Sequence, residues 1–336
     1  MNLAHVHLLL NHTPTIGFGV AICLYAVAFF GKNESLKRTG LVLLFLAAVL
    51  AIPTYISGNF AELRLCPEGE CLSGVSRALI RSHEDAALIA FCVMEITGFL
   101  AWLALWQWRA WQRVPGWNSA AVLVLSLATF AAMANAANKG GEIRHSEIHP
   151  PGDAVVAADQ AEPGSQAAGD AAAAEKTGEG EGLARWLGAV MSGTTGVAWL
   201  WAASETIHFV GLCLLFTVVL FVNLRLLGMA KSLSFVSLYQ LLPLGMIGFG
   251  MNLVTGIGFF MAKPAMYDTW VFYWKIALVV LGGVNVLYFT MLDEVWAVGS
   301  GDDAPASAKG IAASAIAVWL GVLFCGHMLP FLGVSF

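Results

Sequence analysis

Charged residues are scarce in this sequence. Only 12% of its 336 residues are Asp, Glu, Lys or Arg, whereas 58% are hydrophobic, and a soluble domain carries about 25% charged residues. The mean hydropathy is +0.74. The formal net charge is −5, so the chain also lacks the basic excess by which proteins bind nucleic acid. These absences exclude an ordinary soluble domain and predict a polytopic membrane protein.

Long apolar runs are what the sequence has instead. A transmembrane α-helix needs about 20 apolar residues, and runs of this length lie near 8–30, 39–57, 83–108, 118–137, 198–225, 235–261, 267–292 and 311–330. We therefore predict an all-α polytopic membrane protein with about eight transmembrane helices in two four-helix bundles.

A change of composition separates the fourth run from the fifth. Residues 151–182 are rich in Ala, Gly and acidic residues and contain no aromatic residue, so they cannot build a core of their own. We predict a flexible external linker there. It would join an N-terminal membrane domain at 1–150 to a C-terminal membrane domain at 183–336.

Lys and Arg in the short loops predict the orientation, because such residues accumulate on the cytoplasmic side. One set of alternate loops carries Lys32, Lys37, Arg38, Arg109, Arg113, Arg225, Lys231 and Lys309. The opposite set carries Arg64, Arg77, Arg81, Arg144 and Lys263. The excess in the first set predicts a bacterial inner membrane protein with both termini in the periplasm.

The cysteines form neither CxxC nor CxxCH, so neither a cysteine zinc site nor covalent c-type haem is indicated. Cys66 and Cys71 lie in a loop predicted to be external, where the oxidising environment permits a disulfide. Four further cysteines lie inside apolar runs and are interpreted as packing residues: Cys23, Cys92, Cys213 and Cys325.

All eight histidines fall toward the predicted outer side: His5, His7, His12, His83, His145, His149, His208 and His327. A shared depth is what metal or haem ligands require. We predict that His12 and His83 ligate one haem iron and that His208 and His327 ligate a second. His7 with His145 is the candidate pair for a third. The alternative is that these are polar interfacial residues, or buried histidines that bond to a neighbouring helix.

Local sequence supports two of these ligands. Ser82 and Asp85 resemble a capping box, which puts His83 in a first helical turn where the helix dipole disfavours the imidazolium. A neutral imidazole is the form that binds metals. Pro14 suits an early helical position or a kink that turns His12 inward.

In the second half, His208 lies about ten residues into an apolar run, where an ionisable side chain is usually functional. Gly326, next to His327, has no side chain and would permit a cofactor to approach the helix closely. Lys275 has two interpretations, an ion pair with a haem propionate or a side chain that extends to the membrane surface. Glu205 and Glu142 each precede a histidine by three residues, as in di-iron carboxylate bundles, but the bridging carboxylates that such a site needs are not evident.

Three motifs of the first half occur in order: His7-Leu8-Leu9-Leu10-Asn11-His12-Thr13-Pro14, His83-Glu84, and Gly140-Gly141 followed by His145. Over residues 5–150 the chain resembles an uncharacterised bacterial family of four-helix membrane domains, whose members begin with a His-x-x-x-x-His-Phe-Pro-like motif. Thr13 departs from the usual aromatic residue. The resemblance implies haem binding and a role in electron transfer. Residues 204–228 resemble another bacterial membrane family, which implies no particular activity.

The predicted function is that of an integral membrane b-type cytochrome. Bis-histidine iron has no open coordination position, so electron transfer is expected rather than oxygen chemistry. The expected cofactors are two or three haem b groups and a quinone. Electrons would pass between the quinone pool and a periplasmic c-type cytochrome or dehydrogenase, or within a larger respiratory complex. One alternative is an ion or small-solute transporter with a path lined by polar residues inside the helices: Glu95, Asn135, Asn223, Asn252, Asn285 and Lys275. The other is a passive anchor subunit.

Overall fold

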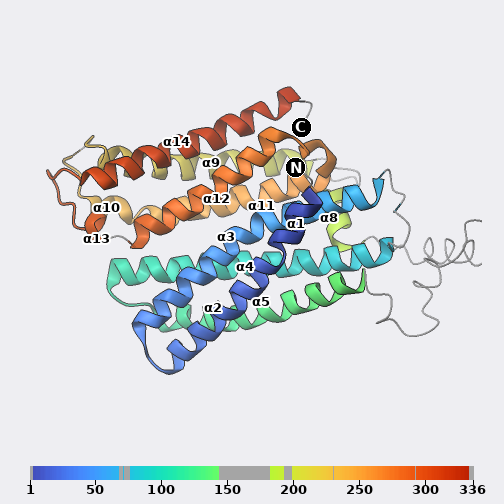
Figure 1. Cartoon of the computed structure of the whole chain (residues 1–336). Helices are drawn as coiled ribbons and strands as arrows, with labels where there is room; N and C mark the ends of the chain where they lie inside the picture. The colour runs from blue at the N-terminus through green and yellow to red at the C-terminus, as the bar shows by residue number, and fades with distance from the viewer. Residues whose placement is uncertain are drawn as a thin grey trace, which may run out of the picture.

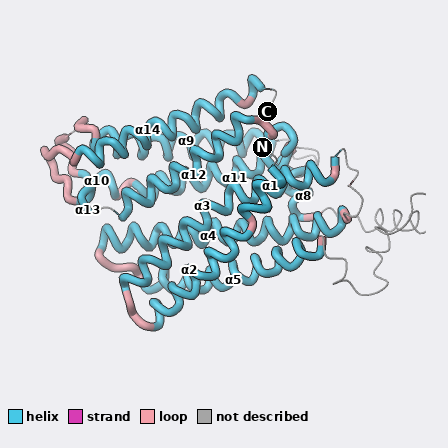
Figure 2. The backbone as a smooth tube through the Cα atoms, in the orientation of Figure 1, coloured by secondary structure: helices cyan, strands magenta, loops and turns pink. Residues whose placement is uncertain are grey.

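The computed structural model describes residues 3–67, 71, 76–143, 182–192, 199–229, 231–291 and 293–332. Within these ranges every regular element is a helix and no strand occurs (Figure 2). Eight helical segments are long and apolar enough to cross a membrane: His5–Phe30, Glu34–Leu65, Arg77–Trp111, Gly116–Glu142, Trp199–Leu226, Phe235–Ala262, Trp270–Met291 and Ala306–Met328. The predicted all-α polytopic fold is confirmed.

The first half contains five helices, α1 (Leu3–Leu10), α2 (His12–Phe30), α3 (Glu34–Leu65), α4 (Arg77–Trp111) and α5 (Gly116–Glu142). The first transmembrane segment is interrupted at Asn11, between α1 and α2. Helix α1 packs on α3, and α4 packs against both α3 and α5. The outer part of α1 is thereby held beside the bundle.

The second half contains the long helices α9 (Trp199–Leu226), α11 (Leu242–Ala262), α12 (Trp270–Met291) and α14 (Ala306–Met328). Shorter elements connect or precede them: α8 (Leu183–Met191), α10 (Phe235–Tyr239), η3 (Pro264–Tyr267), α13 (Asp293–Trp296) and η4 (Pro330–Leu332). Helix α9 packs against α11 and α14, and α14 packs against α12.

A continuous hydrophobic core joins the two halves, with α12 lying against α3 and α4 (Figure 1). Two buried tryptophans of α4 bond across this contact. Trp102 Nε1 donates to Thr290 Oγ1 at 3.2 Å, and Trp106 Nε1 donates to the Tyr239 carbonyl at 3.1 Å. The linker between the halves is therefore not what holds them together.

Helix α8 crosses the outer ends of both halves. Asp85 of α4 caps it, because Asp85 Oδ1 accepts the Ala184 N–H at 2.9 Å. Arg185 pairs with Glu62 of α3 at 3.0 Å. On the other side Gly188 lies against α11, where a Cβ would come within 2.7 Å of the Met261 carbonyl oxygen. A charged pair, a cap and a glycine contact thus fix α8 to three membrane helices.

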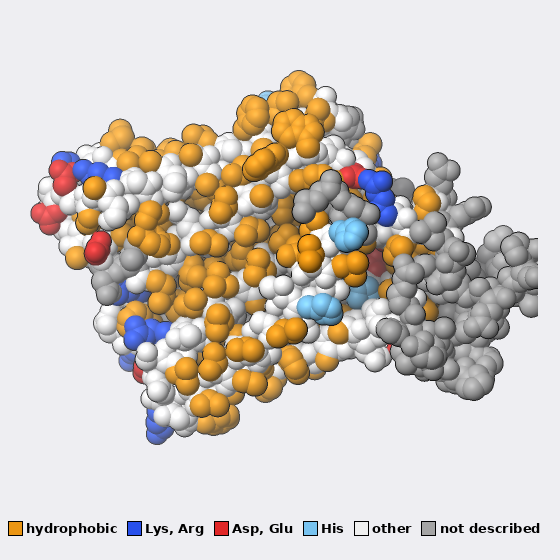
Figure 3. Space-filling view, viewed as in Figure 1, with side chains coloured by type: hydrophobic (Ala, Val, Ile, Leu, Met, Phe, Trp, Pro, Cys, Tyr) orange, Lys and Arg blue, Asp and Glu red, His pale blue; other side chains and the backbone are white. Residues whose placement is uncertain are grey.

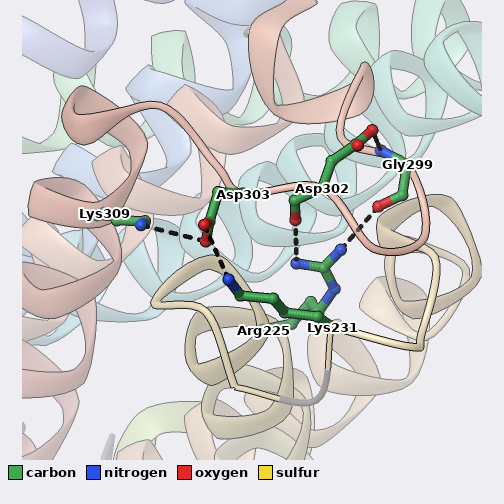
Figure 4. Close-up of polar contacts among 6 residues, drawn as sticks. All are labelled: Arg225, Lys231, Gly299, Asp302, Asp303 and Lys309. Atoms are coloured by element: carbon green, nitrogen blue, oxygen red, sulfur yellow. Dashed lines mark hydrogen bonds and ion pairs between the residues drawn. The ribbon is translucent and has the colours of Figure 1, made fainter.

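The opposite end carries a buried arginine. Arg225, at the end of α9, is 1% exposed, and its three guanidinium nitrogens donate to three backbone carbonyls. Figure 4 shows the two bonds to Gly299 and Asp302. The acceptors are Leu233 at 2.7 Å, Gly299 at 2.7 Å and Asp302 at 3.3 Å. The end of α9 is therefore tied to the loops that precede α10 and α14.

Candidate functional site

His7 of α1 lies in a groove on α3. Its Nδ1 is 3.1 Å from the Thr54 carbonyl oxygen and 3.4 Å from Ser57 Oγ. The ring lies over Gly58, where a Cβ would come within 3.0 Å of His7 Cε1. The imidazole can approach the backbone of α3 this closely because Gly58 has no side chain.

His83 of α4 is held by α5 in the same way. Its Nδ1 is 2.8 Å from the Ala136 carbonyl oxygen. The ring lies over Gly140, where a Cβ would come within 3.0 Å of His83 Cε1. In both cases the accepting carbonyl is four residues before the glycine. That carbonyl oxygen already accepts one intrahelical N–H. Its second lone pair accepts the Nδ1–H of the histidine.

These contacts determine the tautomer of both rings. A carbonyl oxygen can only accept a hydrogen bond, so Nδ1 of His7 and of His83 must carry the proton. In the neutral imidazole the lone pair is then on Nε2. A metal-binding histidine usually has this arrangement, with one nitrogen donating to a carbonyl and the other free for the metal.

His7 and His83 belong to α1 and α4, which both pack on α3. Glu84, next to His83, is within electrostatic range of Glu62, Arg185 and Tyr55. Two anchored imidazoles and a mixed charge cluster under α8 therefore form the candidate site in the first half.

His208 of α9 is anchored by a side chain. Its Nδ1 lies 2.7 Å from Thr255 Oγ1 on α11. The Thr255 hydroxyl is itself 2.7 Å from the Met251 carbonyl, to which it donates. Because the Thr255 hydroxyl proton is donated to Met251, the Thr255 oxygen can only accept a hydrogen bond from His208. The His208 ring therefore also carries its proton on Nδ1 and has its lone pair on Nε2.

Lys275 of α12 is partly buried and lies against α14, where a Cβ on Gly326 would be 3.5 Å from Lys275 Nζ. His327, one residue further along α14, is exposed and has its ring 5.9 Å from that of Phe331. No contact among the described residues joins His327 to His208.

The remaining sequence-predicted residues are placed as follows. His12 begins α2 and is exposed, as is His5 on α1. Pro14 is buried, so it does not turn His12 inward. His145 lies outside the described residues. Cys66 and Cys71 are joined by a disulfide, as the sequence predicts.

The predicted ligand pairs stay predictions. His7, His83 and His208 are each anchored through Nδ1 to a neighbouring helix, whereas His12 and His327 are exposed. Sequence reasoning also missed the residues that anchor the rings, Thr54, Ala136 and Thr255. The signal for two of them was a glycine four residues downstream, at Gly58 and Gly140.

The donor set fits a haem iron held by two imidazoles. Neutral imidazole nitrogens are the ligands that b-type haem takes, and His7 and His83 offer them with their tautomers fixed. Among the described residues no three His, Cys, Asp or Glu side chains gather into a metal site, so a ligand set of two is the one that this part of the chain offers.

The fold and these side chains define the protein as a multi-pass, all-α membrane protein with anchored histidines at one end. Figure 3 shows histidine side chains toward the end at which Figure 1 marks both termini. Comparison of the chain with protein-family models, curated proteins and solved structures gives no match.

Proposed function

We propose that the protein is an integral membrane b-type cytochrome in which His7 and His83 ligate one haem iron. The observation that carries this proposal is the pair of Nδ1–H bonds to backbone carbonyls, which leave both Nε2 atoms as acceptors.

A haem held by two histidines supplies one-electron transfer and has no open coordination position. The residues of the chain would orient the two imidazole ligands and tune the reduction potential of the iron. The Thr54 and Ala136 carbonyls hold the two rings and make Nε2 more basic. Helix α8, fixed by Asp85 and Arg185, covers the outer ends of α3 and α4.

The excess of Lys and Arg at the Arg225 end supports an orientation with that end in the cytoplasm. In the bacterial inner membrane both termini would then face the periplasm. The expected reaction is exchange of electrons between the quinone pool and a periplasmic c-type cytochrome or dehydrogenase, or relay inside a larger complex. A second haem at His208 and His327 stays a prediction. The pair His7 with His145 is the alternative to His7 with His83, because His7 has one free nitrogen and can ligate one iron.

The test is a reduced-minus-oxidised visible spectrum of the detergent-purified full-length protein, with haem quantified as the pyridine haemochrome. We expect a low-spin b-type spectrum that His7→Ala removes. His12→Ala is the matched control, because His12 is exposed on the neighbouring helix, and it should leave the spectrum unchanged. Loss of haem in His12→Ala but not in His7→Ala would restore the pairing expected from the sequence.

An iron-free protein would overturn the cytochrome proposal and leave the transporter and anchor alternatives. The structure gives the transporter little support, because two of its polar candidates bond within their own helices. Asn223 Nδ2 donates to the Val219 carbonyl and Asn252 Nδ2 to the Gly248 carbonyl, at 2.7 Å and 2.9 Å. Such bonds satisfy the amide N–H groups without forming a path.

A further inference from the structure

Glu95 lies at the middle of a membrane-spanning helix. Helix α4 has eighteen residues before Glu95 and sixteen after it, and α4 is one of the segments long and apolar enough to cross a membrane. At 1.5 Å per residue, both ends of α4 are about 24 Å or more from Glu95. The hydrocarbon core of a bilayer extends only about 15 Å to either side of its midplane. The Glu95 carboxyl is therefore surrounded by hydrocarbon and protein.

The helices that pack on α4 bring no counter-charge to this depth. They are α3, α5, α12 and α8. The central stretches of the three long ones contain no Asp, Glu, Lys, Arg or His: 39–61 of α3, 117–138 of α5 and 276–291 of α12. Lys275 is the sixth residue of α12, and α8 is bonded to Asp85, so both lie toward the outer end. Along α4 the nearest charged side chains are Asp85 and Arg109, ten residues before Glu95 and fourteen after it.

The Glu95 carboxyl also has no bonding partner in the part of the chain that the structure describes. Neither of its oxygens makes a hydrogen bond or ion pair there, and Oε1 is buried. An ionised carboxylate without donors or a counter-charge is strongly unfavourable in hydrocarbon, and such a group takes up a proton and becomes neutral. Glu95 is therefore a carboxylic acid, whose O–H is a donor.

One side of α4 next to Glu95 is open to lipid. Ile89, Cys92 and Ile96 are all exposed, and their spacing of three and four residues places them on one side of the helix. Glu95, three residues after Cys92 and half-buried, lies at the edge of that side. Exposed residues of a membrane-spanning segment face hydrocarbon. A lipid-soluble reagent can therefore reach the carboxyl from the bilayer, whereas a charged reagent stays in water.

We propose that Glu95 is a proton-binding site in the hydrocarbon core and that its carboxylic acid reacts with lipid-soluble carbodiimides. The acid O–H adds across one C=N bond of the reagent, with the proton going to nitrogen and the oxygen to the central carbon. The acyl group then moves from that oxygen to a nitrogen and gives an N-acylurea, so the adduct contains the whole reagent and nothing leaves. The reaction requires the bound proton. The inference does not depend on the proposed function, because haem takes no part in it.

The experiment treats the full-length protein in phospholipid vesicles at neutral pH with dicyclohexylcarbodiimide. Peptide mass spectrometry locates and quantifies the adduct. We expect an adduct on Glu95 in the wild-type protein and its complete loss in Glu95→Gln, which keeps the size of the side chain but cannot form the acid. A water-soluble, positively charged carbodiimide should leave Glu95 unlabelled.

Cys92→Ala is the matched control, because Cys92 is exposed on the same side of α4 and a thiol can also react with carbodiimides. It should leave the adduct on Glu95 unchanged. Glu205→Gln removes a half-buried carboxyl near the start of α9 and should also leave that adduct unchanged. Because the adduct is mapped in the wild-type protein, the test does not depend on the folding of any variant.

The outcomes distinguish this inference from the proposed function. Absence of the adduct on Glu95 of the wild-type protein overturns the inference, because the carboxyl would then be ionised or closed to the lipid. Equal labelling of Glu95 by both reagents overturns it as well, because the carboxyl would then be reached from water. Neither result affects the haem proposed at His7 and His83. A haem-free protein that is labelled on Glu95 supports the proton-binding site and rejects the cytochrome.

Discussion

The two ends of the helix bundle treat buried polar side chains differently. At the Arg225 end, the guanidinium donates through all three nitrogens to backbone carbonyls of the same chain. At the other end, His7, His83 and His208 each bond through Nδ1, and within the described ranges no hydrogen bond from their Nε2 atoms occurs. The arginine has its partners within the chain, whereas each anchored histidine keeps an acceptor.

We interpret Arg225 as a structural residue and the anchored histidines as candidate ligand-binding residues, on the following physical grounds. A buried polar group costs free energy unless it is bonded, and Arg225 offsets that cost by donating from each of its three nitrogens to its own loops. The histidines avoid it only in part. We infer that the first end stabilises the fold and that the second is arranged to receive ligands.

The largest effect is expected from removing an anchored histidine. His83→Gly should eliminate the low-spin haem spectrum completely, because the iron would lose one of its two nitrogens. Added imidazole should restore the spectrum by occupying the vacated position. His5→Gly, an exposed histidine at the same end, is the control and should keep its haem. A wild-type spectrum in His83→Gly without imidazole would contradict the assignment of the ligand pair.

The next largest effect concerns the opposite end. Arg225→Met removes three charge-assisted hydrogen bonds, each worth about 1.5–3 kcal/mol, and leaves three carbonyls without this donor. We expect a free energy of unfolding several kcal/mol lower, measured by thermal or denaturant unfolding in detergent, with an unchanged haem spectrum in the folded protein. Arg113→Met, an exposed arginine near the same end, should have almost no effect.

A shifted haem spectrum in Arg225→Met with unchanged stability would contradict this assignment. It would show that Arg225 acts on the histidine end and does not stabilise the fold.

A smaller effect is expected from the glycine beneath His83. A Cβ at Gly140 would lie 3.0 Å from His83 Cε1, whereas a Cβ at Gly141 meets nothing within 4 Å. Gly141→Ala should stabilise α5 by about 0.5–1 kcal/mol, the usual gain in a helix. Gly140→Ala should lose that gain to a crowding cost of about 1–3 kcal/mol.

Displacement of the His83 ring in Gly140→Ala should also change the midpoint potential of the haem, which a redox titration measures. Equal potentials and equal stabilities in the two variants would show that the ring does not depend on Gly140 for its position.

The smallest effect is expected at Asp303, which is fully exposed. Hydrogen bonds from Lys231 and Lys309 lower the pKa of this carboxyl below its ordinary value of 3.8. A lowered pKa means that the ion pairs contribute stability above 3.8, and that this contribution is lost as the pH falls through the lowered value. Asp303→Asn should therefore lower the melting temperature slightly at neutral pH and not in strong acid.

High salt should reduce the difference between Asp303→Asn and wild type, because exposed ion pairs are screened. A difference that persists at high salt and low pH would indicate a structural role beyond the two lysines.

Part of the site was predictable because it depends on position along the chain. Each histidine lies at a depth set by how many residues separate it from the end of its apolar run, and the described ones do collect at one end of the molecule (Figure 3). The pairing was not predictable in the same way. Successive residues of a helix are rotated by about 100°, so the burial of Pro14 points His12, two residues earlier, to the other side.

The same reasoning applies to α14. Gly326 faces Lys275, and the next residue, His327, is turned by about 100° to an exposed position. Which side of a helix faces its neighbours depends on packing with residues far away in the sequence. Glycines such as Gly58 and Gly140 mark a close approach, but the sequence does not say which side chain makes it.

The sequence by itself determined the class of protein and the depth of its histidines, since apolar run length and residue position are properties of the chain. Only the tertiary structure decided which histidines are anchored to a neighbouring helix, which nitrogen of each carries the proton, and which buried charge has its partners within the chain. The physical reason is that the rotation of each helix and the carbonyls that it offers are fixed by contacts between segments that the sequence keeps apart, such as Thr54 with His7 and Ala136 with His83.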